Sequence, residues 1–125
     1  MRLAIFFITT VAVATAGCGT DPDTRPETAD YIIEAILAPT CGRAACHSTD
    51  TRAHNLAFDT IPAALAAMKT SGRGQKLVVP GSPQSSQLVT VLTDTRSPMP
   101  PDSPMPQADI DLITKWVADG AEGLQ

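Results

Sequence analysis

Two cysteines and a histidine lie within the seven-residue segment Cys41-Gly42-Arg43-Ala44-Ala45-Cys46-His47. A thiol can add to a vinyl group of a porphyrin, and an imidazole that directly follows the second thiol can lie beneath the ring and bind the iron. The usual attachment motif has two residues between the cysteines, whereas this segment has four. Because the reach of His47 depends only on Cys46, the longer loop can bulge and keep that pair in place. The segment predicts one covalent haem c, with Cys41 and Cys46 as attachment points and His47 as an axial iron ligand.

The same side chains allow two other chemistries. Cys41 and Cys46 can form a disulfide in a haem-free structural or interaction protein, since exported cysteines meet oxidants. Cys41, Cys46, His47 and His54 also supply four zinc ligands, although an oxidising compartment disfavours free thiolates. An absorption spectrum separates the haem protein from both alternatives.

A low-spin haem needs a second axial ligand on its other face, and three residues compete for this role. Met99 lies in Ser97-Pro98-Met99-Pro100-Pro101, where prolines stiffen an extended backbone that can hold a sulfur against iron. Met105 lies in the near-repeat Ser103-Pro104-Met105-Pro106, and His54 is the only other histidine. Met68, by contrast, falls on the apolar face of an expected helix and is predicted to be a core residue.

The N-terminus resembles a bacterial export signal. Arg2 precedes an uncharged, largely apolar run over residues 3–16 that is too short to span a bilayer as a helix. Ala16-Gly17-Cys18 then resembles the site at which lipoproteins are cleaved and lipidated. We predict a signal peptide over residues 1–17 and a lipid on Cys18, which would place the protein in the cell envelope, facing the periplasm and anchored to a membrane. A plain cleaved signal, giving a soluble periplasmic protein, is the alternative.

Charge and length limit what the exported chain can do. Removal of residues 1–17 takes Arg2 and no acidic residue, which leaves 8 basic and 13 acidic side chains, a net charge of −5. This balance argues against nucleic acid as a partner, so membrane contact would come through the anchor. Residues 18–27 are polar, contain prolines and predict a tether. Residues 28–125 are long enough for one small domain.

The domain is predicted to be all-α, with long connecting loops. Thr28 can cap a first helix that Pro39 ends, and Thr60 or Asp59 can cap a second over about residues 62–69. A third helix is expected after Ser82-Pro83, and a fourth over about residues 107–119 that ends at Gly120. Aromatic residues make up only 4% of the chain, so the core looks thin, which is consistent with helices packed around a haem.

With these pieces in order, residues 31–121 resemble the small monohaem cytochrome c domains of exported planctomycete and myxobacterial proteins. The resemblance rests on an ordered series of short motifs: Ile36-Leu37, Cys46-His47, Leu56-Ala57-Phe58-Asp59, Val78-Val79-Pro80-Gly81-Ser82-Pro83, Ser86-Gln87-Leu88, Met99-Pro100-Pro101 and Ile113-Thr114-Lys115-Trp116-Val117-Ala118-Asp119-Gly120-Ala121. One departure is His54-Asn55, which stands where that family often has a glycine pair.

The resemblance implies roles for particular residues. The histidine after the second cysteine and the methionine of the Met-Pro-Pro motif ligate the iron in that family, which implies His47 and Met99 here. With both axial sites filled, no position would remain open for a substrate. Since no nucleophile–base pair, paired carboxylates or phosphate loop is recognisable either, we predict an electron-transfer protein and not an enzyme, with redox proteins of the cell envelope as partners.

Overall fold

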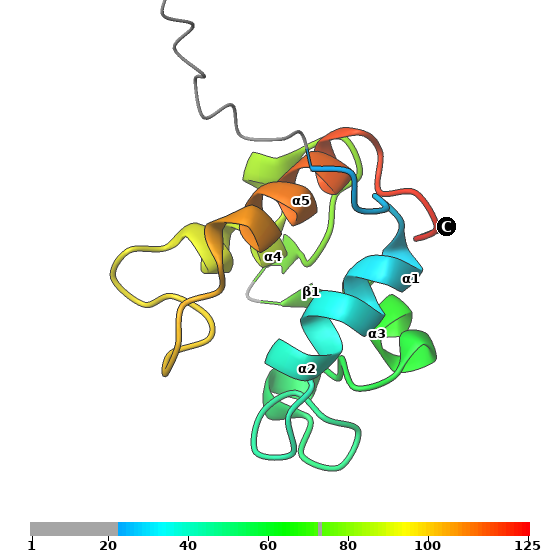
Figure 1. Ribbon diagram of the computed structural model, residues 1–125. Coiled ribbons are helices and arrows are strands. Elements are labelled where there is room, and N and C mark those ends of the chain that lie inside the picture. Colours follow the sequence, from blue (N-terminus) through cyan, green and yellow to red (C-terminus); the bar gives the residue numbers. More distant parts are fainter. Residues whose placement is uncertain (1–22, 73) are drawn as a thin grey trace, which may run out of the picture.

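The computed structural model describes residues 23–72 and 74–125 (Figure 1). The predicted signal peptide and Cys18 lie outside these residues. The described chain is mostly helical, and the all-α prediction is confirmed. No helix in this part of the chain combines the length and apolar character needed to cross a membrane.

The first helical segment runs without interruption from Ala29 to Thr40. It comprises α1 (Ala29–Tyr31), a π-helical stretch (Ile32–Leu37) and α2 (Ala38–Thr40). The Thr28 hydroxyl accepts a hydrogen bond from the Tyr31 N–H, as predicted for the cap. Pro39 does not end the helix, which extends one residue past it. In the π-helical stretch, each backbone N–H donates to the carbonyl five residues earlier. Pro39 has no N–H, so the carbonyl that lacks a helical donor is that of Glu34, an exposed residue.

Three further helices follow close to the predicted positions. They are α3 (Ile61–Met68), α4 (Gln87–Thr93) and α5 (Gln107–Ala118). Thr60 caps α3 by accepting a hydrogen bond from the Ala63 N–H. The predicted third helix is divided, because Ser82 and Pro83 open a separate 3-10 turn (Pro83–Ser85) before α4 begins. The Ser86 hydroxyl accepts from the Val79 N–H at 2.8 Å and holds this junction together.

Two short elements were not predicted. Strands β1 (Ser71–Gly72) and β2 (Gln75–Lys76) pair antiparallel as a minimal hairpin after α3. A 3-10 turn, Ala53–Asn55, lies in the long loop between α2 and α3. Neither element has the length that gives a readable periodicity in the sequence.

The core lies between the first helical segment, α3, α4 and α5 and is built mainly from aliphatic side chains. Trp116 of α5 is its largest fully buried member, and its indole N–H donates to the Glu122 carbonyl at 3.0 Å, so burial leaves that donor satisfied. Met68 is fully buried, which confirms its prediction as a core residue. The buried side chains of α5 are those expected from its helical period: Ile110, Leu112, Ile113, Trp116 and Val117.

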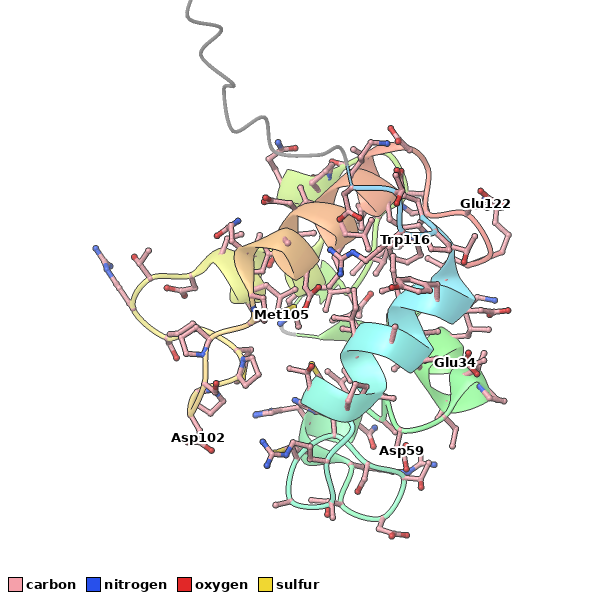
Figure 2. The ribbon with its side chains drawn as sticks, viewed as in Figure 1. Glu34, Asp59, Asp102, Met105, Trp116 and Glu122 are labelled. Atoms are coloured by element: carbon pink, nitrogen blue, oxygen red, sulfur yellow. The ribbon has the colours of Figure 1, made fainter. Side chains whose placement is uncertain are left out.

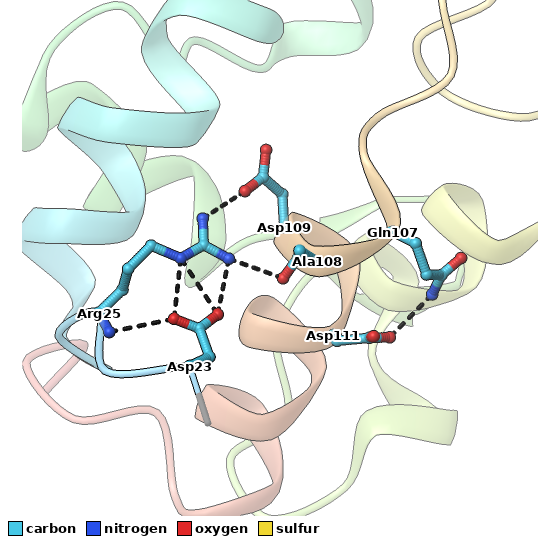
Figure 3. Close-up of polar contacts among 6 residues, drawn as sticks. All are labelled: Asp23, Arg25, Gln107, Ala108, Asp109 and Asp111. Carbon is cyan, nitrogen blue, oxygen red and sulfur yellow. Dashed lines mark hydrogen bonds and ion pairs between the residues drawn. The ribbon is translucent and has the colours of Figure 1, made fainter. Parts of the chain in front are cut away.

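Residues 23–27, predicted to be part of a tether, lie along α5 in the structure (Figures 1 and 3). Ion pairs join Arg25 to Asp109 and Glu27 to Lys115. The sequence shows these charges but not their partners, which are more than 80 residues away along the chain.

Candidate haem site

The two cysteines and His47 lie on one loop that leaves the end of α2. The Cys41 N–H donates to the Leu37 carbonyl at 2.7 Å, so this residue is fixed to the last helical turn. The His47 N–H donates to the Cys41 carbonyl at 3.1 Å, which folds the loop back on itself. Both cysteines are free and half-buried. The structure therefore brings the predicted attachment residues together on one loop.

The His47 ring is oriented by a backbone carbonyl. Its Nδ1 lies 2.9 Å from the Ala53 carbonyl oxygen, which can only accept, so Nδ1 carries the proton. Nε2 is then the unprotonated nitrogen that can bind a metal. The ring also packs edge-on against the buried Phe58, with 5.7 Å between ring centroids. The sequence analysis included Phe58 in the Leu56-Ala57-Phe58-Asp59 motif without assigning it this role, and nothing in the sequence marks Ala53.

A second set of hydrogen bonds joins the residues around His47 to Phe58 and Asp59, which precede α3. The Phe58 N–H donates to the His47 carbonyl at 2.7 Å. The Asp59 carboxylate accepts from the Thr49 N–H at 2.9 Å and from the Thr49 hydroxyl at 2.8 Å. These bonds to Thr49 lower the pKa of the Asp59 carboxyl below its usual value, because they favour the charged form. The sequence suggested Asp59 only as a possible helix cap, a role that Thr60 fills.

Burial raises the pKa of the Cys41 thiol to about 11, and the nearby Cys46 adds to this shift by its own charge. Cys41 therefore stays a protonated thiol at neutral pH.

The two candidate methionines have different surroundings. Met105 is 5% exposed and belongs to the hydrophobic core, where it precedes α5 (Figure 2). Met99 is only half-buried, and its N–H donates to the Val91 carbonyl at 2.9 Å, which ties its loop to α4. In Figure 1 the loop between α4 and α5 extends to the left of the view, whereas the loop that leaves α2 lies at the bottom. Of the two sulfurs, that of Met105 is already used in packing.

His54 lies on the Ala53–Asn55 turn and is exposed. Its φ of 54° is in the left-handed region, as are those of Arg52 and Asn55. A glycine pair would adopt this conformation at lower cost. Over residues 23–72 and 74–125 no three His, Cys, Asp or Glu side chains are arranged to hold a metal ion, so the four candidate zinc ligands are not assembled as a site.

The side-chain types of the attachment loop suit a covalently held haem, whereas none of the contacts above joins Met99 to His47. Cys41 and Cys46 supply two free thiols, His47 supplies an oriented imidazole, and Met99 supplies a thioether from a second loop. When bound, the haem would supply a one-electron Fe(III)/Fe(II) couple.

The mostly helical fold is compatible with a small all-α domain of the cytochrome c kind. In agreement, the sequence model of the planctomycete cytochrome c family matches residues 44–103. This range includes Cys46, His47 and Met99 and begins after Cys41, so it supports a planctomycete-type cytochrome c domain without covering the whole attachment segment. Comparisons with curated proteins and with solved structures find no significant match.

Gly42 is a residue on which the attachment loop depends. A Cβ at this buried position would lie 2.7 Å from the Asp59 nitrogen and 2.8 Å from the Ala38 carbonyl oxygen, both backbone atoms. We expect Gly42→Ala to separate the loop from Asp59, to lower the free energy of unfolding by about 1–3 kcal/mol and to reduce the yield of haem-loaded protein. Thermal unfolding and the haem-to-protein ratio measure these effects. Ala45→Ser, at an exposed position of the same loop, is the control, and equal haem loading in both variants would contradict the prediction.

Proposed function

We propose that this chain is an exported, lipid-anchored c-type cytochrome that carries single electrons. One haem c is held by Cys41 and Cys46, and its iron is ligated by His47 and Met99. The observation that carries the proposal is the His47 ring, which the Ala53 carbonyl holds at 2.9 Å in the tautomer that leaves Nε2 free. The match of residues 44–103 to a cytochrome c family supports it.

The roles of the protein groups follow from their positions. The Ala53 carbonyl and the Phe58 ring orient His47, which keeps Nε2 aimed in one direction and increases the basicity of the imidazole. Ligation by a thioether on the other face favours the reduced iron and so raises the reduction potential relative to a second imidazole. Two strong-field axial ligands leave no coordination position for a substrate, so the proposed role is that of an electron carrier and not of an enzyme.

The proposal is tested by the absorption spectrum and haem content of protein made in a host with haem-attachment machinery. We expect a low-spin c-type spectrum and a mass that corresponds to one haem per chain. A colourless product with a Cys41–Cys46 disulfide would instead identify the haem-free lipoprotein. Native mass spectrometry and a haem stain distinguish the two results.

The lipid anchor has its own test. We expect Cys18→Ala to move the protein from the membrane fraction to the soluble periplasmic fraction, because an acyl chain contributes about 0.8 kcal/mol of membrane affinity per buried CH₂. The haem content should not change, since Cys18 precedes the domain. If the variant and the unmodified protein fractionate alike on immunoblots, the anchor assignment is wrong.

A further inference from the structure

The segment that links the predicted anchor to the domain is attached to helix α5. Arg25 is the centre of this contact (Figure 3): its Nη1 pairs with the Asp109 carboxylate and its Nη2 donates to the Ala108 carbonyl at 2.9 Å. Its side chain is only 29% exposed, and that of Asp109 is 22% exposed. Partial burial of both partners and the additional bond to a backbone carbonyl make this contact stronger than an ordinary surface ion pair.

Further contacts hold the segment on both sides of Arg25. Asp23 accepts from the Arg25 backbone N–H at 3.0 Å and from its guanidinium, so the chain is already turned at that point. Glu27 pairs with Lys115 of α5 at 2.7 Å. Immediately after it, the Ala29 N–H donates to the Glu122 carbonyl at 2.9 Å. We call residues 23–27 the N-terminal strap.

The strap lies at the opposite end of the domain from the Cys41–His47 loop. In Figure 1 the start of the described chain lies beside α5, and the loop that leaves α2 is at the far end of the molecule. For a domain of about 100 residues the radius of gyration is about 13 Å, so two opposite ends are about 30 Å apart. The haem-attachment loop is therefore about one domain diameter from the point at which the chain leaves the domain.

We propose that the N-terminal strap keeps the haem-attachment end of the domain away from the lipid surface and so directs electron exchange to a water-soluble redox protein. The inference rests on the proposed lipid anchor at Cys18. From Cys18 to Asp23 a fully extended chain reaches about 17 Å, which is less than the domain diameter. If the strap were released as far as Thr28, the reach would be about 35 Å, enough for the domain to turn over and place the loop on the bilayer.

Energy transfer from a fluorescent lipid headgroup to the haem tests this proposal, because it falls steeply with distance and does not require the redox partner. The lipidated holoprotein would be bound to phosphatidylcholine vesicles that contain such a lipid. Arg25→Gln combined with Glu27→Gln removes both strap contacts and leaves the net charge unchanged. We expect this variant to quench the headgroup fluorescence severalfold more than the unmodified protein. Asp50→Asn with Lys69→Gln, two exposed positions away from the strap, is the charge-matched control and should quench like the unmodified protein.

A second variant lengthens the free chain and keeps the strap. Insertion of about ten Gly and Ser residues between Thr20 and Asp21 should also raise quenching, because it adds about 34 Å to the fully extended reach of the free chain. If the insertion raises quenching and the double substitution does not, the strap is not what limits the reach, and the proposal is overturned. Equal quenching by all four proteins would overturn it as well. Failure of the unmodified holoprotein to bind vesicles would disprove the anchor itself, and sedimentation shows this before any fluorescence is measured.

Discussion

Replacement of Cys46 by alanine should abolish retention of haem. Cys46 is fixed on both sides, since its N–H donates to the Arg43 carbonyl at 2.8 Å and its carbonyl accepts from the Ala53 N–H at 3.1 Å. It also directly precedes His47, so a thioether at Cys46 places the ring over the ligating nitrogen. Without it, only Cys41 could bond the haem, and that residue lies five positions before Cys46, so nothing would hold the ring beside the imidazole. The measurement is a haem-stained gel after acid–acetone extraction, which removes haem that is not covalently bound.

Cys41→Ala is the matched comparison. It removes the attachment point farther from His47, so we expect partial loading through a single thioether. The reduced spectrum should then shift to longer wavelength, because one vinyl group stays conjugated with the ring. If Cys46→Ala retains as much haem after acid–acetone extraction as the unmodified protein does, the proposal that Cys46 holds the haem covalently is wrong.

Replacement of Met99 by leucine should remove the weak far-red absorption band that an iron–sulfur(Met) bond gives to an oxidised cytochrome. Leucine keeps the volume and apolar character of the side chain but has no sulfur. We therefore expect complete loss of the band, a lower reduction potential and a coordination position open to small exogenous ligands, with little change in the free energy of unfolding. Visible spectroscopy and redox titration provide the measurements.

Met105→Leu and His54→Ala are the controls for the other two candidate ligands. Met105 is a core residue, so its replacement by alanine would lower the free energy of unfolding by about 2–5 kcal/mol, and loss of the band could then reflect unfolding. Leucine is used because it conserves the side-chain volume. Both controls should keep the far-red band. Loss of the band in Met105→Leu alone would assign the ligand to the second half of the Pro-Met-Pro repeat, and loss of low-spin character in His54→Ala would indicate a bis-histidine haem.

Most of the helical architecture could be predicted, because caps and apolar spacing are local signals. Thr28 and Thr60 cap the expected helices, and the buried residues of α5 follow its period. The structure differs from the predicted helices where the same local sequence is compatible with more than one backbone conformation. Pro39 was expected to end a helix and is instead accommodated beyond a π-helical stretch, and Ser82-Pro83 opens a 3-10 turn in place of α4.

The residue types of the candidate site could be predicted, but not the contacts that orient them. Cys41, Cys46 and His47 are adjacent in the sequence, so the structure had only to fold one loop. The support for that loop comes from Ala53 and Asp59, which are ordinary residues used through a backbone carbonyl and a carboxylate that reaches back ten residues. The sequence favours Met99 over Met105 through the Met-Pro-Pro motif, and what it does not reveal is that Met105 is buried in the core.

In the proposed cytochrome, the half-buried position of Cys41 would also protect the chain before haem is attached. With its pKa raised to about 11, the Cys41 thiol carries far less thiolate at pH 7 than an ordinary cysteine does. Thiol–disulfide exchange with an oxidant requires each cysteine of the pair to attack once as a thiolate. Addition of a thiol to a vinyl group, by contrast, consumes the sulfur and its hydrogen together and needs no oxidant. If the chain is exported as proposed, partial burial of this sulfur would slow its dead-end oxidation and leave both thiols available for haem attachment.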